Sequence, residues 1–249
     1  MAKHIIDFKA TEFIKTGTVG AQLNRLNWRT EILLSRNLNS IKGKRVLDLA
    51  SHDGRFSYAS LKLGAKHVTG IEARANLVKN SNKNLTDLGY NSKEFKFIKK
   101  DIFDYLPHVK PKEFDTILCF GFFYHTIRQI ELLREINRIL PQTLILDTRI
   151  AREIPLKKDL DKKAIDNTLN SFNGSLQFKY EKINQKGSTI DPINIVAYPT
   201  KSFINLILNQ YGFGLKEIKW DEQEINDWSN IKDYKNGNRS TYIATLKNI

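Results

Sequence analysis

Short apolar runs alternate with amphipathic stretches through the middle of the chain, and this alternation constrains the fold more than any other feature. Each apolar run is long enough for one strand, and each stretch between them has apolar residues at helical spacing. Strands that alternate with helices in this way predict an α/β fold with a mostly parallel sheet. The expected strands are 45–51, 67–74, 95–101, 114–123 and 143–150, and the expected helices are 56–65, 76–89 and 130–140.

The C-terminal part of the chain predicts a further helix and two more strands. The helix is expected at 199–213 and the strands at 214–220 and 239–248. The 18 residues between these two strands are too few for a comfortable helical crossover, so the strands should run antiparallel. Residues 151–198 are polar and rich in lysine, and we expect an insertion or mobile segment over the sheet edge.

Residues 1–40 predict a helical lead-in to a single domain that spans 41–249. Apolar residues recur there at loosely helical spacing, with arginines among them. Two interpretations stay open: an amphipathic helix packed on the domain, or a lid over a ligand site. Trp28 and Arg29 are candidates to cover such a site, although packing in the core would also explain Trp28.

Cysteine and histidine usage narrows the class of protein. The single cysteine, Cys119, excludes an internal disulfide framework and a cysteine-based zinc site, so a reducing compartment such as the cytoplasm is expected. Histidines 4, 67 and 108 have no metal-ligand spacing, and no metal is predicted. No apolar stretch reaches 18 residues, so we expect no membrane span.

The chain is strongly basic. Lysine and arginine number 40 against 27 acidic residues, which gives a formal net charge of +13. Such a surplus favours anionic partners such as RNA, DNA or phosphorylated metabolites. A bias toward lysine, asparagine and isoleucine from AT-rich coding sequence would also produce it.

Acidic residues lie in the last part of three consecutive predicted strands, toward the sheet edge where parallel sheets bind ligands. Asp48 precedes a turn in which Gly54 leads into a helix, whose backbone N–H groups can face an anion. Glu72 ends the second strand, where a carboxylate can accept hydrogen bonds from both hydroxyls of a ribose. Asp101 ends the third strand, and the apolar Ile102 after it can cover a purine ring. This ordered set predicts a nucleotide site.

The set resembles the class I S-adenosylmethionine-dependent methyltransferase family over about residues 44–150. That family follows its first strand with an acid and three spaced glycines. Asp48 matches the acid and Gly54 the third glycine, whereas Ala50 and His52 stand where the first two glycines usually are. A side chain at His52 would narrow the approach to the methionine part of the cofactor, and it could contact the cofactor carboxylate or simply point away. An acid after the second strand is also typical of sites that bind a dinucleotide such as NAD. This alternative is weaker, because the glycines that let the backbone approach a pyrophosphate are absent here.

The resemblance implies a Rossmann-like, seven-stranded sheet with an antiparallel last strand and helices on both faces. It also implies S-adenosylmethionine as cofactor and S-adenosylhomocysteine as product. By this resemblance Glu72 matches the ribose acid, Asp101 the adenine-side acid, and Gly121 lies in the fourth motif, where substrate meets the nucleotide.

Three short segments are similar to a subgroup that includes the tRNA wobble-uridine carboxymethyltransferases. They are GFFYHT at 121–126, AYPTKSFINLILNQYGF at 197–213 and GNRSTYIA at 237–244. That subgroup uses a carboxylated form of the same cofactor.

Residues after the fourth and fifth strands are candidates for contact with the acceptor. His125 is the leading candidate for a general base, and a structural hydrogen bond to the backbone is the alternative role for it. Tyr124 is a candidate to orient the acceptor. Arg149 suits a clamp on an acceptor carboxylate or phosphate, or a surface ion pair. We expect a small-molecule acceptor. A tRNA-modifying methyl- or carboxymethyltransferase is the alternative, and a non-catalytic cofactor-binding protein is the second alternative. The oligomeric state stays open.

Overall fold

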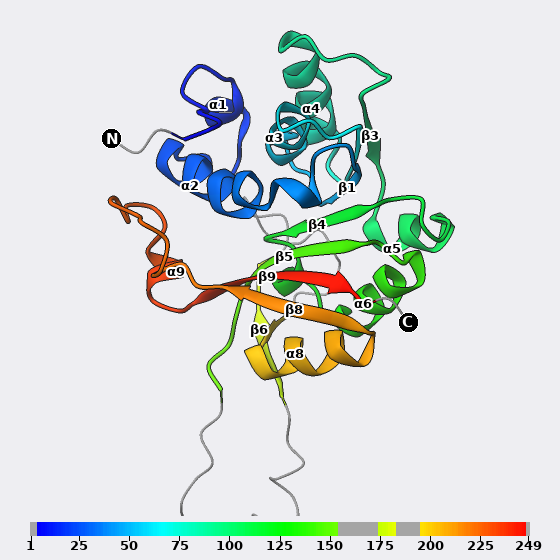
Figure 1. Cartoon of the computed structure of the whole chain (residues 1–249), viewed down its shortest axis with the longest axis vertical. Coiled ribbons are helices and arrows are strands. Elements are labelled where there is room, and N and C mark those ends of the chain that lie inside the picture. The colour runs from blue at the N-terminus through cyan, green and yellow to red at the C-terminus, as the bar shows by residue number, and fades with distance from the viewer. Residues whose placement is uncertain (1–3, 154–173, 183–194, 248–249) are drawn as a thin grey trace, which may run out of the picture.

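The computed structural model describes residues 4–153, 174–182 and 195–247, and its centre is a seven-stranded sheet with helices on both sides (Figure 1). The strand order is β3-β2-β1-β4-β5-β9-β8. The strands of this sheet are β1 Arg45–Leu49, β2 His67–Glu72, β3 Phe95–Lys99, β4 Thr116–Phe120, β5 Thr143–Arg149, β8 Phe213–Ile218 and β9 Arg239–Leu246. The helices are α1 Phe13–Thr16, α2 Leu23–Leu33, α3 Arg55–Lys62, α4 Ala75–Asp87, α5 Ile102–Tyr105, α6 Gln129–Ile139, α8 Lys201–Gln210 and α9 Lys232–Lys235, with 3-10 turns at η1 Ser35–Ser40, η2 Leu106–His108 and η3 Phe123–His125.

The sheet confirms the predicted fold class. Strands β1 to β5 pair in parallel, and β9 is antiparallel to both β5 and β8. Every residue of β4 is buried, which is why that strand is apolar without alternation. The strand ends earlier than predicted, because Gly121 adopts a φ of +77° and turns the chain away after Phe120.

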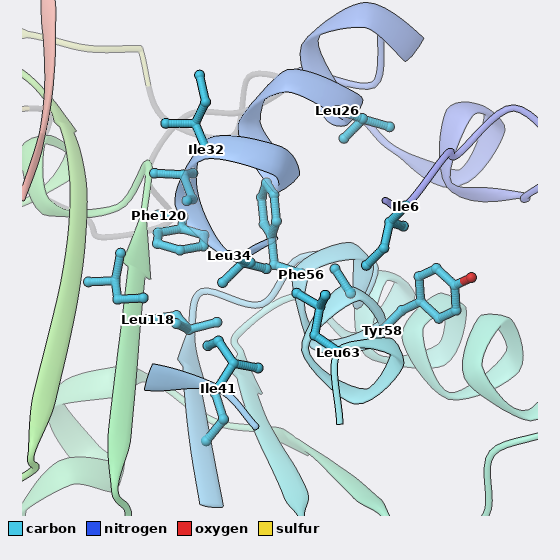
Figure 2. Close-up of a cluster of buried hydrophobic side chains, with 14 of the residues drawn as sticks. Ile6, Leu26, Ile32, Leu34, Ile41, Phe56, Tyr58, Leu63, Leu118 and Phe120 are labelled. Carbon is cyan, nitrogen blue, oxygen red and sulfur yellow. The ribbon is translucent and has the colours of Figure 1, made fainter. Parts of the chain in front are cut away.

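Two apolar clusters hold the helical layers against the two faces of the sheet. The first joins the N-terminal segment, α2 and α3 to β1 and β4, and Figure 2 shows Leu26 and Ile32 of α2 gathered with Phe56 and Phe120. The second cluster packs α5, α6 and α8 on the opposite face. Helix α2 is thereby fixed over the carboxyl ends of β1 and β4, next to the edge where ligands bind in such sheets.

A two-stranded antiparallel sheet was not predicted from the sequence. It pairs β6 (Leu176–Tyr180) with β7 (Ile195–Pro199), inside the stretch expected to be an insertion. Four of the five residues of β6 are exposed, so the strand has no buried face to produce an apolar alternation. The rest of that expected insertion, 154–173 and 183–194, lies outside the described residues.

Candidate functional site

A cavity of about 820 Å³ lies at the carboxyl ends of the parallel strands. Its walls come from α2, from the loops after β1 to β5, from the β6–β7 pair and from the start of β9. Eleven of the thirteen residues singled out from the sequence line it: Arg29, Asp48, Ala50, His52, Glu72, Asp101, Ile102, Gly121, Tyr124, His125 and Arg149.

The other two predicted residues, Trp28 and Gly54, lie elsewhere. Trp28 is only 2% exposed and packs edge-on against His4 in the core, so of its two interpretations packing in the core agrees with the structure and covering the site does not. Gly54 begins α3 with a φ of +84°, and a Cβ there would come within 2.9 Å of Phe97 and Ser81. Gly54 therefore shapes the turn after β1 without lining the cavity.

The turn after β1 has the positive φ angles of a glycine turn, although other residues stand at two of the glycine positions. Ala50 and His52 have φ values of +53° and +56°, a region that favours glycine. The His52 imidazole is held at both nitrogens, with Nε2 2.7 Å from the Thr18 hydroxyl and Nδ1 2.9 Å from Arg55 Nη2. His52 thus ties the segment before α2 to this turn.

Asp53 and Arg55 strengthen the same connection. Arg55 donates to Asp53 and to the Val19 carbonyl, and the Thr16 hydroxyl donates to Asp53 at 2.9 Å. Burial alone would raise the pKa of Asp53, but His52 and Arg55 outweigh it and hold that pKa at about 2. The N-terminal segment is therefore fastened to one end of the cavity by a buried, charged cluster.

Asp48 has the opposite electrostatic setting. It is fully buried at the end of β1, and its Oδ2 accepts a 2.7 Å hydrogen bond from the Ser57 hydroxyl. Burial, with Glu72 and Asp53 nearby, raises the pKa of Asp48 to about 7. The ligand-free site therefore binds a proton that the unfolded chain releases near pH 4.

Replacing Asp48 with asparagine is expected to stabilise the ligand-free protein by an amount that grows with pH. The raised pKa means that wild-type stability falls as pH rises from about 4 through 7, whereas asparagine stays neutral and still accepts from Ser57. The gain should be smallest below pH 4 and should grow to about 4 kcal/mol above pH 7, since a pKa raised from 3.8 to about 7 is a shift of about three units at 1.36 kcal/mol each. Urea unfolding of both proteins at pH 5, 7 and 8 measures it, and a difference that is constant with pH would contradict the assignment.

Glu72 and Asp101 complete the acidic side of the cavity. Glu72 is 5% exposed, and its carboxylate accepts the backbone N–H groups of His52 at 3.2 Å and Arg74 at 3.0 Å. Asp101 caps α5 by accepting from the Phe103 N–H at 2.7 Å. The Ser51 hydroxyl is buried at the cavity wall without a hydrogen-bond partner among the described residues. These groups leave acceptors and a hydroxyl available to a bound ligand.

A buried ionic network borders the cavity on the β5 and β9 side. Asp147 is completely buried and accepts from Arg29 at 2.6 Å, Arg239 at 3.2 Å and Tyr234 at 3.0 Å. Sequence reasoning missed Arg239, although an acid inside the apolar strand 143–150 already required a buried cation. Arg29 was expected to cover the site, and it does reach the cavity, held there by its ion pair with Asp147.

Arg149 and His125 face the cavity between that network and the β6–β7 pair. The Arg149 guanidinium lies 5.8 Å from the centre of the Tyr124 ring, and no carboxylate of the described chain forms an ion pair with it. The His125 side chain does not bond backbone; its Nδ1 lies 2.8 Å from Oε2 of Glu181. Sequence reasoning missed Glu181 because nothing local marks it.

Residues 4–153, 174–182 and 195–247 lack two kinds of feature. Within these ranges no three histidine, cysteine, aspartate or glutamate side chains are grouped to hold a metal ion. Nor does any helix in them have the length and apolar content to cross a membrane.

Known proteins resemble this chain in sequence and in fold. A protein-family model described as "Methyltransferase domain" matches residues 40–188. A tRNA U34 carboxymethyltransferase of Nautilia profundicola is 31% identical over 136 residues, which is 49% of this chain and 41% of that protein. The match thus spans less than half the length of this curated relative.

Solved structures share the fold at low sequence identity. A structure described as a putative S-adenosylmethionine-dependent methyltransferase from Listeria monocytogenes superposes with a TM-score of 0.57 and 14% identity, over 86% of this chain and 97% of that one. The N-terminal domain of EvdMO1, solved with S-adenosylhomocysteine and D-fucose, has a TM-score of 0.60 and 15% identity, over 86% and 81%.

Proposed function

This chain belongs to the methyltransferase-domain family, and from that premise we propose that it methylates a small-molecule acceptor that carries a negative charge. The enzyme is an S-adenosylmethionine-dependent methyltransferase. The observation that carries the proposal about its acceptor is the surplus of arginines in the half of the cavity over β5 and β9.

The half of the cavity over β1, β2 and β3 fits S-adenosylmethionine. Each Glu72 oxygen accepts one backbone N–H, which leaves lone pairs for the two ribose hydroxyls. Ile102, beside Asp101, gives the adenine ring an apolar surface to pack on. The Ser51 hydroxyl has no hydrogen-bond partner among the described residues and can bond a polar group of the cofactor. Bound S-adenosylmethionine supplies a methyl group already activated on sulfur, so the protein mainly aligns the acceptor and excludes water.

The other half of the cavity suits an anion. Glu72 is on β2 and Arg149 is on β5. These two strands are three strand spacings apart in the sheet, which is about 14 Å. This leaves room for an acceptor beyond the cofactor. Arginines outnumber carboxylates in and beside this half, and Arg149 has no ionic partner among the described residues. The arginines are Arg25, Arg29, Arg149 and Arg239, and the carboxylates are Asp147, Asp233 and Glu181, of which Glu181 pairs with His125.

A paired acceptor screen tests this proposal. Hydroxy acids and phosphorylated metabolites are offered beside their neutral esters or amides, and release of S-adenosylhomocysteine is measured by mass spectrometry. The charged member of each productive pair should react faster. Arg149→Met should lower kcat/KM for it by about 10- to 100-fold, the value of one charge-assisted hydrogen bond, with cofactor affinity unchanged. Arg152→Met, an exposed arginine outside the cavity, is the matched control. Equal rates with neutral acceptors would refute the proposal.

A tRNA acceptor is the second candidate, favoured by the name of the Nautilia relative and by the net charge of +13. In this case the transferred group can be carboxymethyl, supplied by the carboxylated cofactor. Binding of bulk tRNA should then weaken steeply between 50 and 200 mM salt, because released counterions contribute a log–log slope of about −0.9 per phosphate contact. A binding curve that is flat with salt would exclude this candidate.

A further inference from the structure

We propose that His125 and Glu181 form a proton-accepting pair, and that the acceptor therefore presents a hydroxyl that loses its proton during transfer. The inference rests on the proposed function and deepens it. Glu181 is assigned as a positioning residue, and His125 as the group that touches the reacting hydroxyl.

The pair joins two parts of the chain that are distant in sequence. His125 ends η3, directly after β4, and Glu181 follows β6. Nδ1 of His125 lies 2.8 Å from Oε2 of Glu181, and the two side chains are 16% and 21% exposed. Because an ionised carboxylate only accepts hydrogen bonds, Nδ1 carries the proton in the neutral ring. Nε2 is then the basic nitrogen, and no described residue occupies it with a hydrogen bond.

The turn that carries His125 is anchored to the β6–β7 sheet. The Ala197 N–H of β7 donates to the Thr126 carbonyl at 3.2 Å. The buried Gln129 side chain donates to the carbonyls of Phe123 at 3.1 Å and Ala197 at 2.7 Å. These bonds fix the distance between the two halves of the pair before any ligand binds, which is the arrangement that an oriented general base requires.

Aromatic and cationic groups surround the pair. The Tyr124 ring lies 4.1 Å from that of His125, and the Tyr198 ring of β7 packs edge-on against Tyr124 at 5.3 Å. Three cations face these rings: Arg149 and Arg239 over Tyr124, and Lys179 over Tyr198. Glu181 is the carboxylate in contact with His125, so it is the group that pairs with the ring when His125 takes a proton.

The proposed step balances as follows in atoms and charge. The acceptor oxygen forms a new O–C bond with the methyl group as the S–C bond of the sulfonium breaks, and the electron pair of that bond stays on sulfur. His125 takes the hydroxyl proton at Nε2 and becomes an imidazolium paired with Glu181. The proton then passes to water, which restores the neutral ring. A hydroxyl with a pKa well above neutrality needs such a base, whereas one that is already ionised does not.

The tautomer of His125 tests the pair without any acceptor. In ¹⁵N-histidine-labelled protein, long-range ¹H–¹⁵N correlation spectra distinguish the two ring nitrogens, and His125→Asn assigns the signal. We expect Nε2 to be the unprotonated nitrogen of the neutral ring in the wild type. Glu181→Ala should move the proton to Nε2, whereas Glu94→Ala, which removes a partly buried glutamate outside the cavity, should not. A wild-type ring that is protonated at Nε2 overturns the proposal.

Kinetics with the acceptors found in the screen tests the chemical role. His125→Asn should lower kcat by about 10²- to 10⁴-fold and remove the acid limb of the pH–rate profile. Glu181→Gln should lower kcat by roughly tenfold without changing cofactor affinity. Both losses should shrink across a series of increasingly acidic hydroxyls. Losses that do not depend on hydroxyl acidity overturn the proposal.

The same measurements separate this inference from the proposed function. If the proposed function is wrong, S-adenosylmethionine fails to bind in calorimetry or no anionic acceptor reacts, while the tautomer of His125 still follows Glu181. If only the inference is wrong, an anionic acceptor is methylated and Glu181→Gln behaves as the wild type.

Discussion

Asp147→Ala is expected to lower the free energy of unfolding by about 3–5 kcal/mol, because the change deprives two buried arginines of the carboxylate they share. Asp147 is completely buried and is paired with both Arg29 and Arg239. No other carboxylate of the described chain bridges these two guanidinium groups, since Asp233 reaches only Arg239 of the two. Burial alone would raise the pKa of Asp147, but Arg239 and Arg29 outweigh it and hold that pKa below its ordinary value.

Urea unfolding at pH 7 measures this loss, with Asp87→Ala as the control. Asp87 pairs with Lys83 on the exposed face of α4, where removal of an ion pair should cost less than about 1 kcal/mol. Because the pKa of Asp147 is depressed, its contribution is present above pH 4 and is lost as pH falls through the lower, folded-state value. The gap between wild type and Asp147→Ala should therefore narrow in acid. Equal losses from Asp147→Ala and Asp87→Ala would show that the network contributes nothing special.

Glu72→Ala is expected to weaken cofactor binding on the order of 100-fold. An ionised carboxylate that accepts from both ribose hydroxyls makes two charge-assisted hydrogen bonds, together worth about 3 kcal/mol, and each 1.4 kcal/mol is a factor of ten. Calorimetric titration of S-adenosylmethionine and S-adenosylhomocysteine measures the change, with NAD as the ligand that should not bind. An unchanged dissociation constant would remove Glu72 from the site.

Glu72 also accepts two backbone N–H groups, so its loss has a structural component that needs a control. Glu72→Gln keeps an oxygen for one of these bonds and loses the charge. Glu72→Gln should melt close to the wild-type temperature and still bind the cofactor more weakly.

Asp101→Ala removes the cap of α5 and should lower the free energy of unfolding by about 1 kcal/mol. Its effect on cofactor affinity should be smaller than that of Glu72→Ala, because the adenine ring offers Asp101 one exocyclic amine, whereas the ribose offers Glu72 two hydroxyls.

Local features made the fold and the acidic half of the cavity predictable. Apolar runs mark β1, β2, β4 and β5 because those strands are mostly buried on both faces, and Asp48, Glu72 and Asp101 occur where strands end. Each of these signals lies within a few residues of sequence. The parallel sheet then brings the strand ends to one edge, so the neighbourhood of these acids follows from topology alone.

The other half of the cavity depends on contacts that no local pattern records. Asp147 meets Arg239 across 92 residues and Arg29 across 118. Glu181 meets His125 across 56. Trp28 was left between core and cavity for a related reason: all residues from Leu26 to Thr30 are buried, so the periodicity of α2 does not distinguish a side that faces the cavity from one that faces the core.

The position of β9 has a consequence for the order in which the sheet assembles. β9 follows β8 in the chain, yet it lies between β5 and β8. A nascent chain that has β1 to β5 in place therefore presents the unpaired backbone of β5, and β8 has no strand to join until residues 239–246 emerge. An open strand edge of this kind is an aggregation hazard, so chaperone dependence should concentrate in the interval before β9 inserts. The same insertion delivers Arg239 to Asp147, so the second cation of the buried network arrives with the strand that completes the sheet.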